Sequence, residues 1–257
     1  MGTIRIFTFA TLNELWQSWN PVSKDDHTTV DVFVLDLFSE ELQIPVTLSQ
    51  AEHARSERFV MEADRKTFVK SRSFLRILIS KVVGCQVEEI ELETNEFGKP
   101  QITGPNSSLQ FNVSHSRELA LVAIAWNVSV GADLERHRKI DETALANKYF
   151  SLAESKTIGQ LQSENRRKAF FDCWTLKEAF VKCLGKGLQI PLAQFQVDFM
   201  NDQQMCKNRL VRCDFETPHI ADSFLLKLTI ANGYSAAISL CGSQLTDRDW
   251  QIQETGS

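Results

Sequence analysis

The sequence predicts an α+β fold built from two similar halves. In each half, short segments rich in β-branched and aromatic residues surround one long segment whose apolar residues have helical spacing. A length of 257 residues allows one large domain or two small ones. We expect a boundary near Asn127, giving residues 1–127 and residues 128–257. Each half is expected to be a small antiparallel sheet packed on a long helix, with the strands of the two halves side by side.

The first half begins with two predicted strands, Ile4 to Phe9 and Asp31 to Phe38. A helix is predicted over residues 51–81, since Ser49 and Glu52 form a capping box at its start and Gly84 suits a left-handed stop. Eight basic and four acidic side chains lie on this segment. The excess of positive charge fits either a solvated helix face or a docking surface for a polyanion.

A loop over residues 95–100 leads to three further predicted strands. The strand from Leu109 ends near Ser114-His115-Ser116 and forms a hairpin with Leu119 to Trp126. The strand Val128 to Glu135 alternates in character, so its two faces differ. One face carries Val128, Val130, Ala132 and Leu134, and the other carries Gly131, Asp133 and Glu135.

The second half repeats this order of elements. A capping box at Ser151 and Glu154 starts one helix, and a longer helix runs from Arg166 to Leu184 and ends at Gly185. Asn232-Gly233 is a strong hairpin signal between the last two of three predicted strands. These strands are Phe195 to Phe199, Phe224 to Ile230 and Tyr234 to Leu240. The polar residues 243–257 are expected to be frayed.

Composition excludes several classes of function. The 33 acidic residues exceed the 28 basic ones, and the net charge of −5 disfavours a nucleic-acid partner. No apolar run reaches the ~18 residues that a membrane helix needs, and the N-terminus lacks the apolar stretch of a signal peptide. The six cysteines form no C-x-x-C pair, which disfavours zinc and fits reduced thiols. We therefore expect a cytoplasmic protein without a membrane segment.

Asp133 and Glu135 are the first candidate site. Residues i and i+2 of a strand face the same way, about 7 Å apart, and two carboxylates so placed repel each other unless a cation lies between them. A hard divalent cation with oxygen ligands would satisfy both. The alternative is that both carboxylates are simply solvated at the end of an exposed strand.

The helix around Trp174 is the second candidate site. Trp174, Glu178 and Lys182 have i, i+4, i+8 spacing and share one stripe of the helix. The pattern fits an ordinary Glu–Lys bridge of a few tenths of a kcal/mol. It fits equally a carboxylate and an ammonium directed into a cleft.

Ser114-His115-Ser116 is the third candidate, because ligand sites gather where strands end. The residue types suggest a hydrolase, but no G-x-S-x-G elbow is present and neighbouring strand residues point apart. Glycine-rich G-x-G-x-x-G and Walker A sequences are also missing from the chain.

Taken in order, four motifs resemble the 4′-phosphopantetheinyl transferases of the Sfp type. They are Phe97-Gly98-Lys99-Pro100, Phe111-Asn112-Val113-Ser114-His115-Ser116, Gly131-Ala132-Asp133-Leu134-Glu135, and the stretch from Trp174 to Lys182 followed by Gly185-Lys186-Gly187. The resemblance covers about residues 45–200. It implies two α+β halves with the active site in the cleft between them. It also implies transfer of the phosphopantetheine arm of coenzyme A to a serine of an apo acyl or peptidyl carrier protein, with release of adenosine 3′,5′-bisphosphate.

The resemblance also implies roles for individual residues. Asp133, Glu135 and Glu178 become ligands of Mg²⁺, and Lys182 and His115 contact the phosphates of coenzyme A. Ser114 and Lys99 line the nucleotide pocket, and Arg55 belongs to the basic cluster of the first helix. Glu178, directly or through a metal-bound water, is the candidate base, while Lys182 neutralises the departing bisphosphate. The reacting groups are therefore expected to be Glu178, Lys182 and His115.

Several partner and rival hypotheses remain at this stage. Residues 139–158 are expected to form part of the docking surface for the carrier protein, through Tyr149 and Phe150, unless these aromatics belong to the core. A monomer is expected, because two fused halves already complete the cleft. A metal-dependent nuclease is the main rival, although its Glu-x-Lys pair lies on a strand, whereas Glu178 and Lys182 are four residues apart on a helix. A module that only binds coenzyme A or a carrier protein is the third hypothesis.

Overall fold

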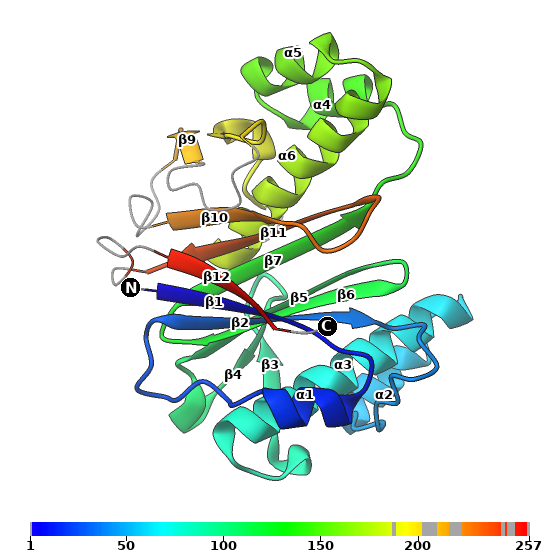
Figure 1. The fold of residues 1–257 in the computed structure, drawn as a ribbon, viewed down its shortest axis with the longest axis vertical. Helices are drawn as coiled ribbons and strands as arrows, with labels where there is room; N and C mark the ends of the chain where they lie inside the picture. The colour runs from blue at the N-terminus through cyan, green and yellow to red at the C-terminus, as the bar shows by residue number, and fades with distance from the viewer. Residues whose placement is uncertain are drawn as a thin grey trace.

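The computed structural model describes residues 2–186, 189–201, 210–215, 223–242, 245 and 250–255. They form two sheets that face each other in the middle of the molecule, with helices outside each sheet (Figure 1). The predicted α+β class is confirmed. Gly187 of the fourth motif lies outside the described residues, as does Cys206.

The first sheet has five strands in the order β12-β1-β2-β6-β5. The predicted hairpin of β5 and β6 is confirmed, but β1 runs parallel to both of its neighbours. The expectation of an antiparallel sheet is therefore wrong for β1. A parallel pair needs a crossover connection, and the short helix α1 (Leu12–Ser18) supplies it between β1 and β2. The strands are β1 (Gly2–Thr8), β2 (Thr29–Asp36), β5 (Leu109–Ser116), β6 (Leu119–Trp126) and β12 (Trp250–Thr255).

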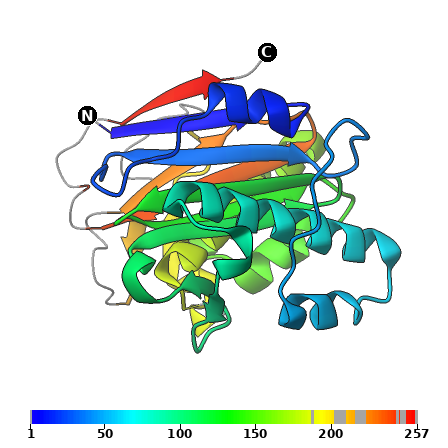
Figure 2. The ribbon, with the colours of Figure 1, turned by 90° about the horizontal axis from the view of Figure 1, so that it is seen from below.

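Residues 250–255 form the strand β12. The prediction that residues 243–257 are frayed is therefore wrong for this part of the segment. β12 pairs in parallel with β1, although the two strands come from opposite ends of the sequence (Figures 1 and 2). Trp250 is buried and packs near Phe224, so one apolar residue anchors an otherwise polar segment. The sequence did not reveal this strand because its composition is polar: it lies at the sheet edge, and Trp250 is its one buried residue.

The second sheet is antiparallel throughout, as predicted, in the order β10-β11-β7. Gly233 has a φ of 77° in the turn between β10 and β11, which is the left-handed conformation that the Asn-Gly signal indicates. Among the described residues, two further pairs of short strands lie outside these two sheets. The elements are β7 (Ser129–Arg136), β10 (Ser223–Leu228) and β11 (Tyr234–Cys241), then β3 (Leu92–Thr94) with β4 (Pro100–Ile102), and β8 (Phe195–Val197) with β9 (Leu210–Cys213).

Helices cover the outer face of each sheet. The segment predicted as one helix over residues 51–81 is in fact two helices, α2 and α3. They fold against each other, so that Glu52 of α2 meets Arg72 and Arg76 of α3, both at 3.4 Å. One straight helix would hold Glu52 and Arg72 about 30 Å apart. The helices are α2 (Gln50–Ser56), α3 (Glu62–Val83), α4 (Glu142–Tyr149), α5 (Leu152–Gln160) and α6 (Ser163–Leu184).

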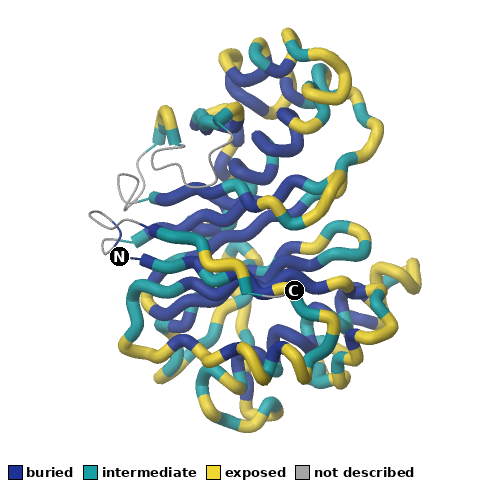
Figure 3. The backbone as a smooth tube through the Cα atoms, viewed as in Figure 1, coloured by how far each residue is buried: buried dark blue, intermediate teal, exposed yellow. Residues whose placement is uncertain are grey.

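Alternating side chains divide the buried residues into three layers. On β6, Leu121 and Ala123 pack between the two sheets, while Val122 and Ile124 pack under α1 and α3. A third cluster joins α6 to the outer face of the second sheet. Figure 3 shows the same arrangement, with buried strands in the centre and exposed loops and helix surfaces outside. Among the described helices, none combines the length and the apolar character that crossing a bilayer requires.

A fully buried lysine fixes the orientation of α6. The Lys177 ammonium lies 2.9 Å from the carboxylate of Glu154 on α5, and it donates to the backbone carbonyls of Leu192 and Phe195. Glu154 in turn accepts from the backbone N–H of Val197. Because burying a charge is costly unless it is paired, this network allows one rotation of α6. A different stripe of the helix, about 100–140° around its axis from Lys177, then presents Glu178 and Lys182.

We expect Lys177→Met to lower the free energy of unfolding by about 3–5 kcal/mol, because the carboxylate of Glu154 stays buried without its counter-ion. Urea unfolding would measure the change. The double variant Lys177→Met/Glu154→Gln should recover part of the loss. Lys156→Met, at an exposed position of α5, is the matched control and should change stability by less than about 0.5 kcal/mol. A Lys177 variant as stable as this control would contradict the assignment.

Candidate active site

The two sheets meet at their edge strands, β5 and β7, through side chains rather than backbone pairing. The Asn112 side chain accepts from the backbone N–H of Ala132 at 3.0 Å, Ser114 Oγ accepts from Leu134 at 3.2 Å, and Ser116 Oγ accepts from Arg136 at 3.0 Å. The offset is 20 residues each time, so the strands run parallel. Polar side chains on every second residue of β5 thus replace the carbonyls of a neighbouring strand.

The opposite edge of β7 pairs with β11, and one face of β7 lies unusually close to α6. A Cβ on Gly131 would lie 2.0 Å from the Ala179 carbonyl oxygen and 2.4 Å from the Cys183 nitrogen. Both of these are backbone atoms and cannot turn away. A glycine is therefore needed here, and it allows the stripe of α6 that carries Glu178 and Lys182 to lie over Asp133.

Lys182 and Asp133 form the centre of the site. The ammonium of Lys182 lies 2.6 Å from Asp133 Oδ1 and also donates to Ser114 Oγ and to the Ala132 carbonyl, each at 3.2 Å. Ser114 Oγ itself donates to Asp133 Oδ1 at 3.0 Å. The other carboxylate oxygen of Asp133, Oδ2, is buried and has no hydrogen-bond partner. An unpaired buried oxygen is costly, so a ligand at this point would stabilise it.

Glu178 faces the two carboxylates of β7. Burial raises the pKa of Glu178 above its ordinary value, the charges of Asp133 and Glu135 raise it further, and the Lys182 ammonium lowers it. Glu135 accepts from Arg138 at 2.8 Å and from Ser116 Oγ at 3.3 Å. The structure thus brings the three predicted metal ligands to one end of β7.

The oxygens of the three carboxylates are suitable ligands for a divalent cation, but in this structure the three groups do not converge on one point. In the described part of the chain, no three acidic, histidine or cysteine side chains lie close enough to hold a metal ion together. Lys182 and Arg138 each bind one of the carboxylates. The unpartnered oxygen of Asp133 and the mutual repulsion felt by Glu178 are the features that a divalent cation would relieve.

Lys99 reaches this region from the first half. Its ammonium donates to the carbonyls of Val130 at 3.1 Å and Lys182 at 2.9 Å, and burial lowers its pKa. Asn95 in the same loop donates to the Gly185 carbonyl at 3.0 Å. The loop of the first motif therefore binds the C-terminal end of α6 and one residue of β7.

His115 and Arg55 line a separate cavity of about 220 Å³ on the first half. The alternation of β5 directs Ser114 toward Asp133 and His115 to the opposite side. The Arg55 and Arg72 guanidinium groups lie over the Phe68 ring, 5.2 and 5.8 Å from its centre. Desolvation lowers the pKa of His115, and the charge of Lys182 lowers it further. The cavity therefore offers cations to a ligand, while the buried Phe68 ring is covered by Phe59 and by the two guanidinium groups.

Sequence reasoning did not single out Arg72, Phe68 or Asn112, although all three line this cavity. The spacing of Phe68 and Arg72, i and i+4 on α3, is the signal that places them on one helix face. An adjoining hollow of about 490 Å³ shares Arg55, Phe68 and Arg72, so the basic cluster lines both.

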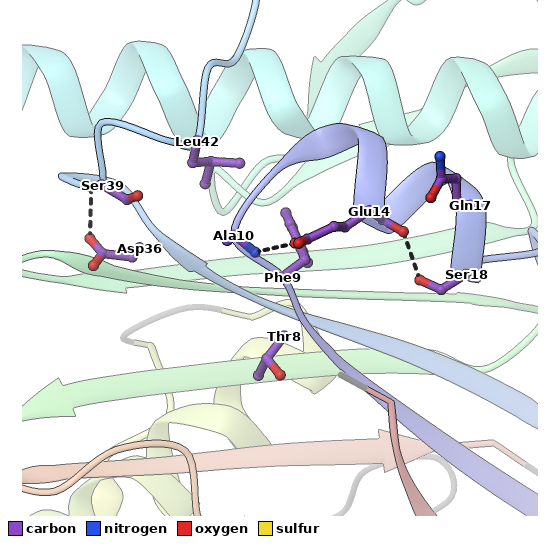
Figure 4. Close-up of a pocket in the computed structure, with 9 residues that line it drawn as sticks. All are labelled: Thr8, Phe9, Ala10, Glu14, Gln17, Ser18, Asp36, Ser39 and Leu42. Atoms are coloured by element: carbon purple, nitrogen blue, oxygen red, sulfur yellow. Dashed lines mark hydrogen bonds between the residues drawn. The ribbon is translucent and has the colours of Figure 1, made fainter. Parts of the chain in front are cut away.

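A hollow of about 640 Å³ lies elsewhere, beside α1 and the ends of β1 and β2 (Figure 4). Its two carboxylates already accept backbone hydrogen bonds. Glu14 caps the start of α1 at Ala10 and Thr11, and Asp36 binds the N–H groups of Phe38 and Ser39. None of the predicted site residues lines this hollow.

Comparison with known proteins agrees with this geometry. A family model described as the 4′-phosphopantetheinyl transferase superfamily matches residues 129–239, and a model of the N-terminal part of such transferases matches residues 38–127. The curated 4′-phosphopantetheinyl transferase HetI of Nostoc is 36% identical over 159 residues, 60% of this chain and 67% of the relative. The chain belongs to the 4′-phosphopantetheinyl transferase family.

Two other 4′-phosphopantetheinyl transferases support the assignment. The enzyme psf-1 of Bacillus pumilus is 30% identical over 184 residues, 72% of this chain and 76% of the relative. The enzyme Sfp of Bacillus subtilis is 28% identical over 158 residues, 62% of this chain and 69% of the relative. The resemblance stated from the four motifs is confirmed, and the chain is an enzyme of this transferase family.

We expect Gly131→Ala to lower the free energy of unfolding by about 1–3 kcal/mol, because the added methyl group forces α6 away from β7. Chemical unfolding would measure the loss. Gly159→Ala in α5 is the matched control, since a Cβ at this position would have no neighbouring atom within 4 Å. It should stabilise the helix by up to about 1 kcal/mol. Equal effects of the two substitutions would show that the close approach at Gly131 has no structural role.

Proposed function

We propose that the protein transfers the 4′-phosphopantetheine arm of coenzyme A to a serine of an apo acyl or peptidyl carrier protein, in a reaction that requires Mg²⁺ and releases adenosine 3′,5′-bisphosphate. The observation that supports this most is the juxtaposition of Glu178 and Lys182 on α6 with Asp133 on β7. Membership of the family supplies the class of reaction.

Asp133, Glu135 and Glu178 would hold the magnesium ion. Their oxygens are the donors that Mg²⁺ prefers, and phosphate oxygens of the substrate would complete its coordination. When bound, the ion neutralises negative charge on the diphosphate of coenzyme A.

The cavity beside His115 would bind the nucleotide end of coenzyme A. This end carries phosphates, and Arg55, Arg72 and His115 offer hydrogen-bond donors to them. Lys99 and Ser114 would hold the neighbouring strand β7 in place, because Lys99 donates to the Val130 carbonyl and Ser114 donates to Asp133.

In the reaction, the carrier serine oxygen attacks the phosphorus that bears the pantetheine arm. The bond from that phosphorus to the oxygen of the nucleotide 5′-phosphate breaks, and the bisphosphate leaves with the bonding electrons. Glu178 would accept the serine proton, a role favoured by its raised pKa. Lys182 would neutralise charge on the leaving bisphosphate.

The carrier protein would dock near α4 and α5. Leu152 is 85% exposed and Tyr149 is 37% exposed, whereas Phe150 is buried and packs on Phe170 and Trp174. Of the two aromatics predicted to touch the carrier, Phe150 therefore belongs to the core. The exposed Lys148 and Lys156 could steer an acidic partner to this surface.

We also propose that the chain divides near Asn127 into two halves of related build, with the active site in the cleft between them. The two family models meet at this point, at residues 127 and 129, which supports the division. We propose that the protein is a monomer in the cytoplasm, because the residues of the site come from one chain. The net charge of −5 fits the absence of a nucleic-acid partner.

The transferase proposal is tested by incubating an apo carrier protein with the enzyme, coenzyme A and Mg²⁺. Mass spectrometry should show a gain of ~340 Da, the mass of the phosphopantetheine arm. Asp133→Ala and Glu178→Ala should each abolish the gain while thermal stability stays near that of the wild type. Glu164→Ala, at an exposed carboxylate of α6, should leave transfer intact. Full activity of the Asp133 variant would refute the metal assignment.

We expect His115→Ala to raise the KM for coenzyme A about tenfold, because a hydrogen bond to a charged phosphate is lost. Initial rates at varied coenzyme A concentrations measure this. His53→Ala removes a histidine from the exposed part of α2, outside both basic hollows, and should leave KM unchanged. An unchanged KM in the His115 variant would remove this residue from the phosphate site.

A further inference from the structure

The ammonium of Lys182 is the counter-ion of Asp133 in the acidic site. All three acceptors of its ammonium belong to the seam between β5 and β7: Asp133 Oδ1, Ser114 Oγ and the Ala132 carbonyl. The Lys182 side chain is 30% exposed, while that of Asp133 is only 7% exposed. A cation of the chain thus holds one oxygen of Asp133, while the other oxygen is buried without a partner.

The second ion pair of the site is of a different kind. Arg138 binds Glu135 at 2.8 Å, but its side chain is 54% exposed and solvent screens the interaction. The ion pair at Asp133 therefore affects the binding of a divalent cation more than the ion pair at Glu135 does. An ammonium and a divalent cation a few ångströms apart repel each other strongly in a partly buried site.

We propose that Lys182 couples metal binding to diphosphate binding: in the free enzyme its ammonium neutralises Asp133, and a nucleotide diphosphate draws the ammonium away and so frees Asp133 for the divalent cation. The inference rests on the proposed function, because it takes the diphosphate of coenzyme A as the incoming anion. No covalent bond changes in this exchange of partners.

The structure allows this movement without a change of fold. The flexible four-carbon stem of a lysine lets the ammonium move while the backbone stays in place. The backbone of α6 is held by the close packing at Gly131 and by the buried pair of Lys177 and Glu154. Ser114 keeps its hydrogen bonds to Asp133 and to the Leu134 N–H, so Asp133 stays oriented when Lys182 leaves.

Coupling of this kind is reciprocal and can be measured without turnover. The divalent probe is Mn²⁺, whose free concentration is followed by electron paramagnetic resonance, with and without coenzyme A. A blank containing coenzyme A and Mn²⁺ alone corrects for binding to the nucleotide. The wild type should bind Mn²⁺ weakly alone and at least about fivefold more tightly with coenzyme A.

Lys182→Met should bind Mn²⁺ about tenfold more tightly than the wild type when coenzyme A is absent, and the gain on adding coenzyme A should shrink. Arg136→Gln is the matched control, since it also removes one positive charge, at the last residue of β7, but breaks a pair with Glu118 instead of Asp133. It should leave the affinity for Mn²⁺ nearly unchanged. If Lys182→Met fails to fold, Lys182→Gln makes the same measurement.

Two results would overturn the proposal. The first is a Lys182 variant that binds Mn²⁺ no more tightly than the wild type without coenzyme A. The second is an equal tightening by Arg136→Gln, which would reveal a general effect of net charge. If the wild type modifies a carrier protein while either result is found, the coupling alone is refuted. If the wild type transfers nothing but the Lys182 variant tightens as expected, the proposed function fails and the coupling stands.

Discussion

The side-chain hydrogen bonds between β5 and β7 are the constraint on which the rest of the structure depends. Asn112, Ser114 and Ser116 bind successive backbone N–H groups of β7 and so fix its register against the first sheet. The same register places Asp133 beside Ser114 and Glu135 beside Ser116. A slip of one residue would turn both carboxylates away. The contact that joins the two sheets therefore also positions the candidate metal ligands.

The helix α6 completes the site because two opposite features fix it. On one side, the missing side chain of Gly131 lets the helix backbone approach β7. On the other side, the buried ammonium of Lys177 binds Glu154 and two backbone carbonyls. The neighbours Lys177 and Glu178 thus serve different purposes. Lys177 holds the helix in its orientation, and Glu178 is presented to the carboxylates of β7.

Local patterns were enough to predict most of the elements and much of the candidate site. The capping boxes at Ser49 and Ser151, the glycines that end α3 and α6, and the Asn-Gly turn are all confirmed. The alternation of β7 correctly separated its apolar face from Asp133 and Glu135. Such signals are readable because they involve neighbours along the chain.

Features that depend on distant residues could not be predicted in this way. The break between α2 and α3 lets Glu52 pair with Arg72 and Arg76, which lie 20 and 24 residues away in the sequence. Arg72 and His115 line the same cavity because the fold places β5 opposite α3, and this placement cannot be read from local sequence. The pairing of Lys182 with Asp133, 49 residues apart, likewise needed the folded chain.

Because β12 pairs with β1, the first sheet contains residues from both ends of the sequence. The proposed boundary lies near Asn127, yet one of the two outer strands of the first sheet, β12, comes from residues 250–255. A fragment ending at the boundary would leave the β1 edge with unpaired backbone groups, open to association with other chains. Gly2 would also lose the Trp250 ring that covers it. Residues 1–127 therefore depend on a strand from residues 250–255 to cover one edge of their sheet and to keep that edge from pairing with other chains.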